Sequence, residues 1–110
     1  MSPTGGDVVQ LADRIGTSVA SRASVATAFG VVRLAGGDPW RAALIAANIG
    51  DDTDTIGAIA TGMAGACAGF SAMPKNKSVQ VCTANGLDLA PIANALLDLR
   101  AGSAAGKAAR

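Results

Sequence analysis

The chain has 110 residues, half of them apolar, and a formal net charge of +1. All eight acidic residues are aspartates, and the absence of histidine, glutamate and tyrosine excludes most general acid–base catalysis and zinc sites built on histidine. The nine lysines and arginines form no basic stripe, so we expect no nucleic acid partner.

The length predicts one domain, and its 25 alanines and three aromatic residues predict a core of small, closely packed side chains. Two cysteines, Cys67 and Cys82, are more typical of buried packing atoms than of a disulfide. With no signal sequence at the N-terminus, we expect a cytoplasmic protein with reduced thiols. The uncharged stretch at 56–73 is too rich in small residues to predict a membrane span.

The first half of the chain predicts a flexible start over residues 1–6 and then two helices. The first covers Asp7 to Ile15 and ends at Gly16, and the second covers Ser18 to Leu34. Apolar positions at helical spacing predict the inward face of the second helix: Val19, Ala23, Ala26, Phe29 and Val32.

Two further helices are predicted in the middle of the chain. Asp38 followed by Pro39 is a strong start signal, and that helix runs to about Asn48. The next helix covers 56–70, with Pro74 as its stop. Its glycines at 62, 65 and 69 indicate neighbours that approach closely.

The C-terminal part gives a weaker pattern. Residues 75–77 predict a solvated turn, and the alternation over 78–84 fits either a strand or one or two turns of helix. An amphipathic helix follows over Leu87 to Leu99, and we expect a disordered tail over 101–110. The fold class predicted is all-α, a compact fragment of about five helices forming a single domain over residues 7–100.

Three carboxylates fall within four positions at Asp51, Asp52 and Asp54. Helix N-termini favour carboxylates through capping and the helix dipole, at about 0.3–1 kcal/mol each. A hard cation such as Mg²⁺ is the alternative, because Asp54 and Thr55 would share the first helical turn if Asp52 caps it. An EF-hand is excluded, since no Glu closes the loop. From these residues alone both explanations stay open.

The run from Asn48 to Ala60, continuing through a small-residue helix to Pro74, resembles the C-terminal signature of the ADP-ribosylglycohydrolases, relatives of the dinitrogenase reductase-activating glycohydrolase. That signature reads Gly-Gly-Asp-Thr-Asp-Thr before a helix of small residues. Upstream, Gly16 with Ser24-Val25 and Ala28 is similar to the family's loop and following helix. Downstream, 89–100 is similar to its closing helix.

The resemblance implies an all-helical fold and metal-dependent cleavage of an N- or O-glycosidic bond to ADP-ribose, carried by a protein or a small molecule. It implies that Asp52, Asp54 and Thr55 are ligands of a two-metal Mg²⁺ or Mn²⁺ centre, and it assigns no catalytic side chain. It also places the loop of Thr17, Ser18 and Val19 beside the ribose or phosphates.

The chain departs from the family pattern in three ways. Family members are longer and carry further ligands in an N-terminal half, Cys67 and Ala68 stand where two aromatic residues are usual, and Asp51 stands where glycine is common. We therefore expect a C-terminal portion that is inactive alone, with the missing half or a second copy as a partner. The alternative is a non-catalytic helical interaction module or truncated remnant.

Overall fold

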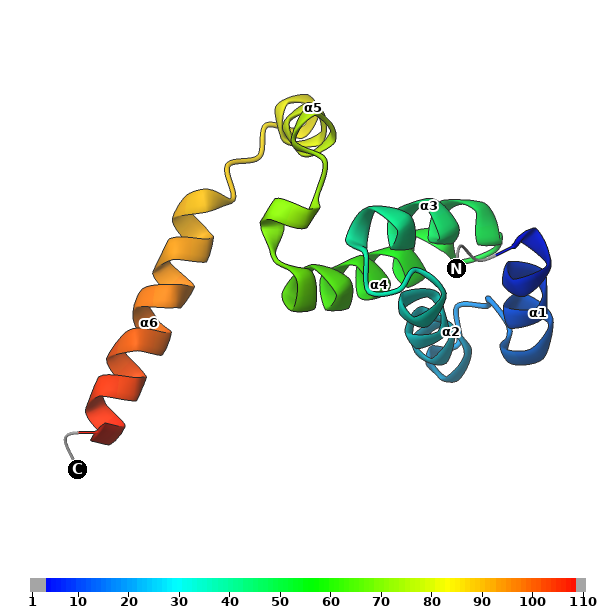
Figure 1. The fold of residues 1–110 in the computed structure, drawn as a ribbon, viewed down its shortest axis with the longest axis horizontal. Helices are drawn as coiled ribbons and strands as arrows, with labels where there is room; N and C mark the ends of the chain where they lie inside the picture. Colours follow the sequence, from blue (N-terminus) through cyan, green and yellow to red (C-terminus); the bar gives the residue numbers. More distant parts are fainter. Residues whose placement is uncertain (1–3, 109–110) are drawn as a thin grey trace. The chain divides into compact units, whose positions relative to one another are not determined.

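The structure is a computed structural model that describes residues 4–108. These residues form six α-helices and one short 3₁₀-helix, with no strand among them (Figure 1). The elements are α1 (Gly5–Ile15), α2 (Ser21–Leu34), α3 (Pro39–Ile49), α4 (Thr53–Ala68), η1 (Phe70–Ala72), α5 (Lys75–Asn85) and α6 (Ala90–Ala108). The predicted all-α fold class is confirmed.

The chain divides into two compact units, Met1–Lys75 and Asn76–Arg110. We describe each unit by itself, and the single domain predicted over residues 7–100 stays a prediction. The first unit holds α1 to α4 and the candidate site residues.

In the first unit, α4 packs against both α2 and α3, and α1 packs on α2 (Figure 1). Most of the buried side chains are alanines, as the composition predicted. The core consists of Ala28, Val31, Ala35, Ala42, Ala46, Ile56, Ala60 and Ala64. Because these side chains are small, the helices approach closely, and a Cβ added at Gly57 would lie 3.5 Å from the Cβ of Ala46. This packing fixes the position of the N-terminus of α4.

The start of α3 is the one the sequence predicted. The Asp38 carboxylate accepts a hydrogen bond from the Arg41 N–H at 2.9 Å, and Pro39 occupies the first helical position. The start of α1 lies earlier than predicted, because Thr4 and Asp7 form a capping box and the helix begins at Gly5. The predicted flexible start is thereby shortened, and residues 1–3 lie outside the described part.

The inward face of α2 agrees with the predicted one in part, because Ala23 is buried and Val32 packs against the core. The buried residues of this helix are Ala23, Ser24, Thr27, Ala28 and Val31. Phe29 is 62% exposed and Val19 lies before the helix, which begins at Ser21. The prediction included the large side chains of Val19 and Phe29, whereas contact with α4 at this short distance favours small ones.

The glycines of α4 do not act as predicted. A Cβ added at Gly62 or Gly65 would meet nothing within 4 Å, so neither glycine marks a close neighbour. Gly69 instead ends the helix with a φ of 84°, a left-handed conformation that glycine adopts without strain. The helix therefore covers Thr53–Ala68, and not the predicted 56–70.

The second unit corrects two predictions. Residues 75–85 form a helix, α5. The turn predicted at 75–77 is therefore wrong, and residues 78–84, for which a strand and a helix were both possible, are helical. The last helix continues to Ala108, although the sequence predicted a disordered tail from 101. Alanine, the best helix former, accounts for this extension. Residues 109 and 110 lie outside the described part.

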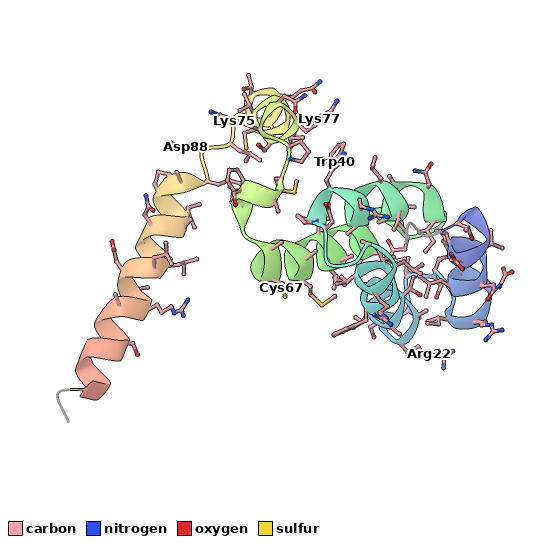
Figure 2. All side chains as sticks on the ribbon, in the orientation of Figure 1. Arg22, Trp40, Cys67, Lys75, Lys77 and Asp88 are labelled. Carbon is pink, nitrogen blue, oxygen red and sulfur yellow. The ribbon has the colours of Figure 1, made fainter. Side chains whose placement is uncertain are left out.

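Both cysteines are free, and Cys67 is exposed near the end of α4, where it is labelled in Figure 2. The prediction that the cysteines are buried packing atoms is therefore wrong for Cys67, and Cys82 is only half-buried. Over residues 4–108, no helix has the length and apolar character needed to cross a membrane.

Candidate metal centre

The acidic cluster lies in the tight turn between α3 and α4. Gly50 ends α3 with a φ of 92°, and Asp51 follows with a φ of 58°. Within the described residues, Asp51 is the one non-glycine residue with positive φ. A left-handed backbone disfavours residues with a Cβ, although Asp tolerates it better than most. This conformation explains why glycine suits position 51.

Asp52 is the residue that precedes α4, the position in which the sequence allowed it to act as a cap, but its carboxylate does not cap the helix. Its φ of −79° and ψ of 54°, with the Thr53 N–H donating to the Asp51 carbonyl at 2.8 Å, form an inverse γ-turn. No side-chain capping hydrogen bond is made. The carboxylate of Asp38 is used for capping, whereas that of half-buried Asp52 is not. Simple capping therefore does not account for Asp52.

Asp54 and Thr55 lie in the first turn of α4, and both are exposed. The next residue, Ile56, is fully buried and anchors this turn in the core. Asp54 also lines a cleft of about 320 Å³ between α3 and α4. Across residues 4–108, no group of three or more aspartates and cysteines converges to hold a metal ion. Asp51 therefore does not add a third carboxylate to Asp52 and Asp54.

The loop between α1 and α2 meets this turn through the backbone. The N–H of Asp52 donates to the carbonyl oxygen of Thr17 at 2.9 Å. This bond brings Thr17, one of the residues predicted to lie near substrate, next to a predicted metal ligand. Ser18 and Val19 are exposed, Val19 at 81%.

One residue of this arrangement escaped the sequence prediction. Thr27, fully buried on α2, donates from its hydroxyl to the carbonyl oxygen of Gly16 at 2.5 Å. Gly16 has a φ of 97°, and its N–H donates to the Ala12 carbonyl at the end of α1. A threonine on the inward side of a helix of small residues was the available signal, because a buried hydroxyl needs a partner.

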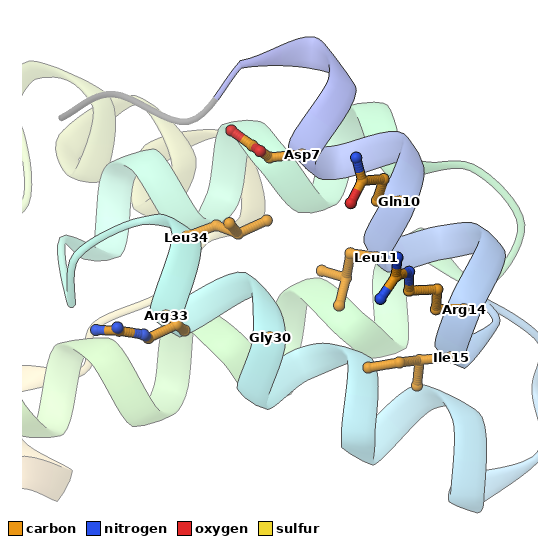
Figure 3. A pocket seen from close by; sticks show the side chains of 8 residues that line it. All are labelled: Asp7, Gln10, Leu11, Arg14, Ile15, Gly30, Arg33 and Leu34. Atoms are coloured by element: carbon orange, nitrogen blue, oxygen red, sulfur yellow. The ribbon is translucent and has the colours of Figure 1, made fainter.

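A second cleft, of about 330 Å³, lies between α1 and α2 (Figure 3). Its lining residues are Asp7, Gln10, Leu11, Arg14, Ile15, Gly30, Arg33 and Leu34. In Figure 3 the Arg33 side chain points away from Leu11 and Arg14, so the two guanidinium groups do not converge. None of the predicted site residues lines this cleft.

Comparison with known proteins assigns the chain to a family. A family model described as ADP-ribosylglycohydrolase matches residues 3–106. The chain belongs to the ADP-ribosylglycohydrolase family. It is 40% identical over 91 residues to a protein of Escherichia coli strain K12 named uncharacterized protein YegU. The match covers 83% of this chain and 27% of YegU, so the chain spans about a quarter of the length of this relative. No solved structure matches.

Membership in the ADP-ribosylglycohydrolase family confirms the resemblance read from 48–74. The donor chemistry at the turn suits a hard cation. Asp52, Asp54 and Thr55 offer carboxylate and hydroxyl oxygens, which Mg²⁺ prefers, and nitrogen or sulfur donors are absent from this triplet. These residues therefore fit one side of a Mg²⁺ or Mn²⁺ site.

Proposed function

We propose that this chain forms one side of the metal centre of an ADP-ribosylglycohydrolase, an enzyme that hydrolyses a glycosidic bond to ADP-ribose. Asp52, Asp54 and Thr55 are the proposed ligands of Mg²⁺ or Mn²⁺, in a centre of two metal ions. The loop of Thr17, Ser18 and Val19 is the proposed contact for the ribose or phosphates. The substrate proposed is an ADP-ribosylated protein or small molecule.

The observation that carries this proposal is the hydrogen bond from the Asp52 N–H to the Thr17 carbonyl at 2.9 Å. It joins the proposed ligand turn to the proposed substrate loop within the first compact unit. The carboxylate of Asp52, which makes no capping bond, supports a role other than helix capping. Family membership supplies the reaction class.

The metal, when bound, orients ribose hydroxyls and lowers the pKa of a bound water. Asp52, Asp54 and Thr55 would hold it, and the loop of Thr17, Ser18 and Val19 would set the substrate beside it. Because these three residues would supply only three protein oxygens, the remaining ligands would be water, substrate or other protein oxygens. Because the chain spans about a quarter of YegU, we propose that further ligands come from sequence outside these 110 residues. A cytoplasmic location is proposed from the two free thiols.

A melting experiment tests the proposal. Cation binding to the folded chain must raise the melting temperature, because ligands that bind only the folded state stabilise it. We expect millimolar Mg²⁺ or Mn²⁺ to raise it for the unchanged chain, and to do so less for Asp52→Asn and Asp54→Asn. Asp13→Asn, an exposed aspartate on α1, is the matched control and should behave like the unchanged chain.

The competing function is a non-enzymatic helical module that binds a protein partner or a second copy. Large apolar side chains exposed on the first unit favour it, including Phe29 at 62% and Phe70 at 74%. An unchanged melting temperature at millimolar cation would favour this module over the metal site. In either case we expect these 110 residues alone, with Mg²⁺, to release no ADP-ribose from an ADP-ribosylated peptide.

A further inference from the structure

The loop that meets the candidate metal centre is held from behind by one buried hydroxyl group. Thr27 is fully buried on α2, and its hydroxyl donates to the Gly16 carbonyl at 2.5 Å. Gly16 is also held by its own N–H, which donates to Ala12 at 2.9 Å. The loop residue that follows, Thr17, accepts the hydrogen bond from Asp52 at 2.9 Å.

We propose that Thr27 is a positioning residue for the metal centre: its hydroxyl fixes the Gly16–Thr17 backbone, which in turn holds Asp52 through its N–H. The Thr27 hydroxyl bonds to Gly16, which precedes the proposed substrate loop, so Thr27 acts on Asp52 only through the backbone of Gly16 and Thr17. The inference that Thr27 serves a metal centre rests on the proposed function. The effect of Thr27 on the position of Asp52 can be tested without metal.

The chemistry of the contact requires the hydroxyl group and not only the shape of threonine. The Gly16 carbonyl is half-buried, and a carbonyl shielded from water without a partner is unfavourable. A valine at 27, with nearly the same shape as threonine, would therefore favour movement of the Gly16 carbonyl toward water. A serine at 27 keeps the hydroxyl and loses one methyl group. Valine should therefore release the loop, and serine should keep it in place.

Amide hydrogen exchange at Asp52, measured by NMR on the metal-free chain, tests this directly. We expect Thr27→Val to lower the protection of the Asp52 amide by about tenfold, and Thr27→Ser to retain it. Amides in the middle of α4, such as that of Ala60, should lose no more protection than the change in global stability of the variant accounts for. Thr61→Val is the matched control, because it removes a hydroxyl that donates to the Gly57 carbonyl at 2.6 Å within α4.

A uniform loss of protection across α2 and α4 in Thr27→Val would mean that Thr27 is only structural, and would overturn the proposal. Equal behaviour of the serine and valine variants would overturn it as well. If Thr27→Val does not fold, Thr27→Ala, which also removes the hydroxyl, replaces it in the same measurement. Protection of the Asp52 amide equal to that of Thr27→Ser would then overturn the proposal.

Mn²⁺ affinity separates this inference from the proposed function. We expect Thr27→Val to weaken Mn²⁺ binding severalfold and Thr27→Ser to restore it, whereas Thr61→Val should have no effect. If the unchanged chain binds no Mn²⁺, the proposed function fails, and the exchange result at Asp52 still decides whether Thr27 positions this turn. If Mn²⁺ binds equally to the valine variant, the positioning role is wrong and the metal site stands.

Discussion

The backbone N–H of Asp52 donates to the carbonyl oxygen of Thr17 at 2.9 Å, and this bond joins the loop before α2 to the turn before α4. The Asp52 amide thus bonds to a loop distant in sequence, whereas the carboxylate of the same residue makes no capping hydrogen bond. A residue arranged in this way can present its side chain to a ligand while its backbone is fixed.

The left-handed backbone at Asp51 predicts that glycine at this position gives a more stable protein than alanine. Its φ of 58° is unfavourable for any residue with a Cβ. We expect Asp51→Gly to be more stable than Asp51→Ala by about 1 kcal/mol, because both remove the charge and only glycine relieves the backbone. Urea denaturation of the two variants gives the comparison. Equal stability would show that the left-handed conformation is not retained in solution.

Ile56 anchors the first turn of α4, so its truncation should destabilise the first unit. It is fully buried and is the largest side chain in this core. We expect Ile56→Val to cost about 1 kcal/mol and Ile56→Ala about 2–5 kcal/mol of unfolding free energy. Val9→Ala, at a position 58% exposed on α1, should change stability by less than about 0.5 kcal/mol. Similar losses at the two positions would contradict the observed core.

The capping box at the start of α1 predicts a pH dependence. Hydrogen bonds from the Thr4 backbone N–H at 2.7 Å and the Thr4 hydroxyl at 3.0 Å lower the pKa of Asp7 below its ordinary 3.8. Because the folded pKa is lowered, the stabilisation is present above pH 3.8 and is lost as the pH falls through the lower folded value.

NMR titration of the Asp7 carboxyl group measures this shift. Thr4→Ala removes the hydroxyl but keeps the backbone N–H, which is the larger cause, so the pKa of Asp7 should rise only part of the way toward 3.8. Thr61→Val, on α4, is the control and should leave the Asp7 titration unchanged. A full return to 3.8 in Thr4→Ala would mean that the backbone bond contributes nothing.

Local signals explain what the sequence predicted correctly. Asp38 followed by Pro39 specifies a helix start within a few residues, and α3 begins there. The start of α4 was predicted less well, because the helix expected from Ile56 begins at Thr53. The inward face of α2 was predicted in part: Ala23 and Val32 were placed correctly, but Phe29 is exposed, because the closely packed core beside α2 consists largely of alanines of α3 and α4.

The assignment of the candidate site stays a prediction, although two of its residues lie next to each other. Family resemblance placed Asp52, Asp54, Thr55 and the loop at Thr17 in one site, and the bond between Asp52 and Thr17 brings part of that set together. Thr27 was not predicted, because its role depends on a carbonyl group of another element. Every residue has a backbone carbonyl, so the sequence does not show which carbonyl a side chain contacts. Such a contact is known only from the structure.

Binding of Mn²⁺ to the 110-residue chain, followed by electron paramagnetic resonance, tests the central claim most directly. We expect the free-ion signal to fall as Mn²⁺ binds the unchanged chain, and Asp52→Asn or Asp54→Asn to weaken binding by about tenfold or more. Asp13→Asn should bind like the unchanged chain. An undiminished Mn²⁺ signal at millimolar protein, or equal binding by Asp54→Asn and the unchanged chain, would contradict a metal centre at this turn.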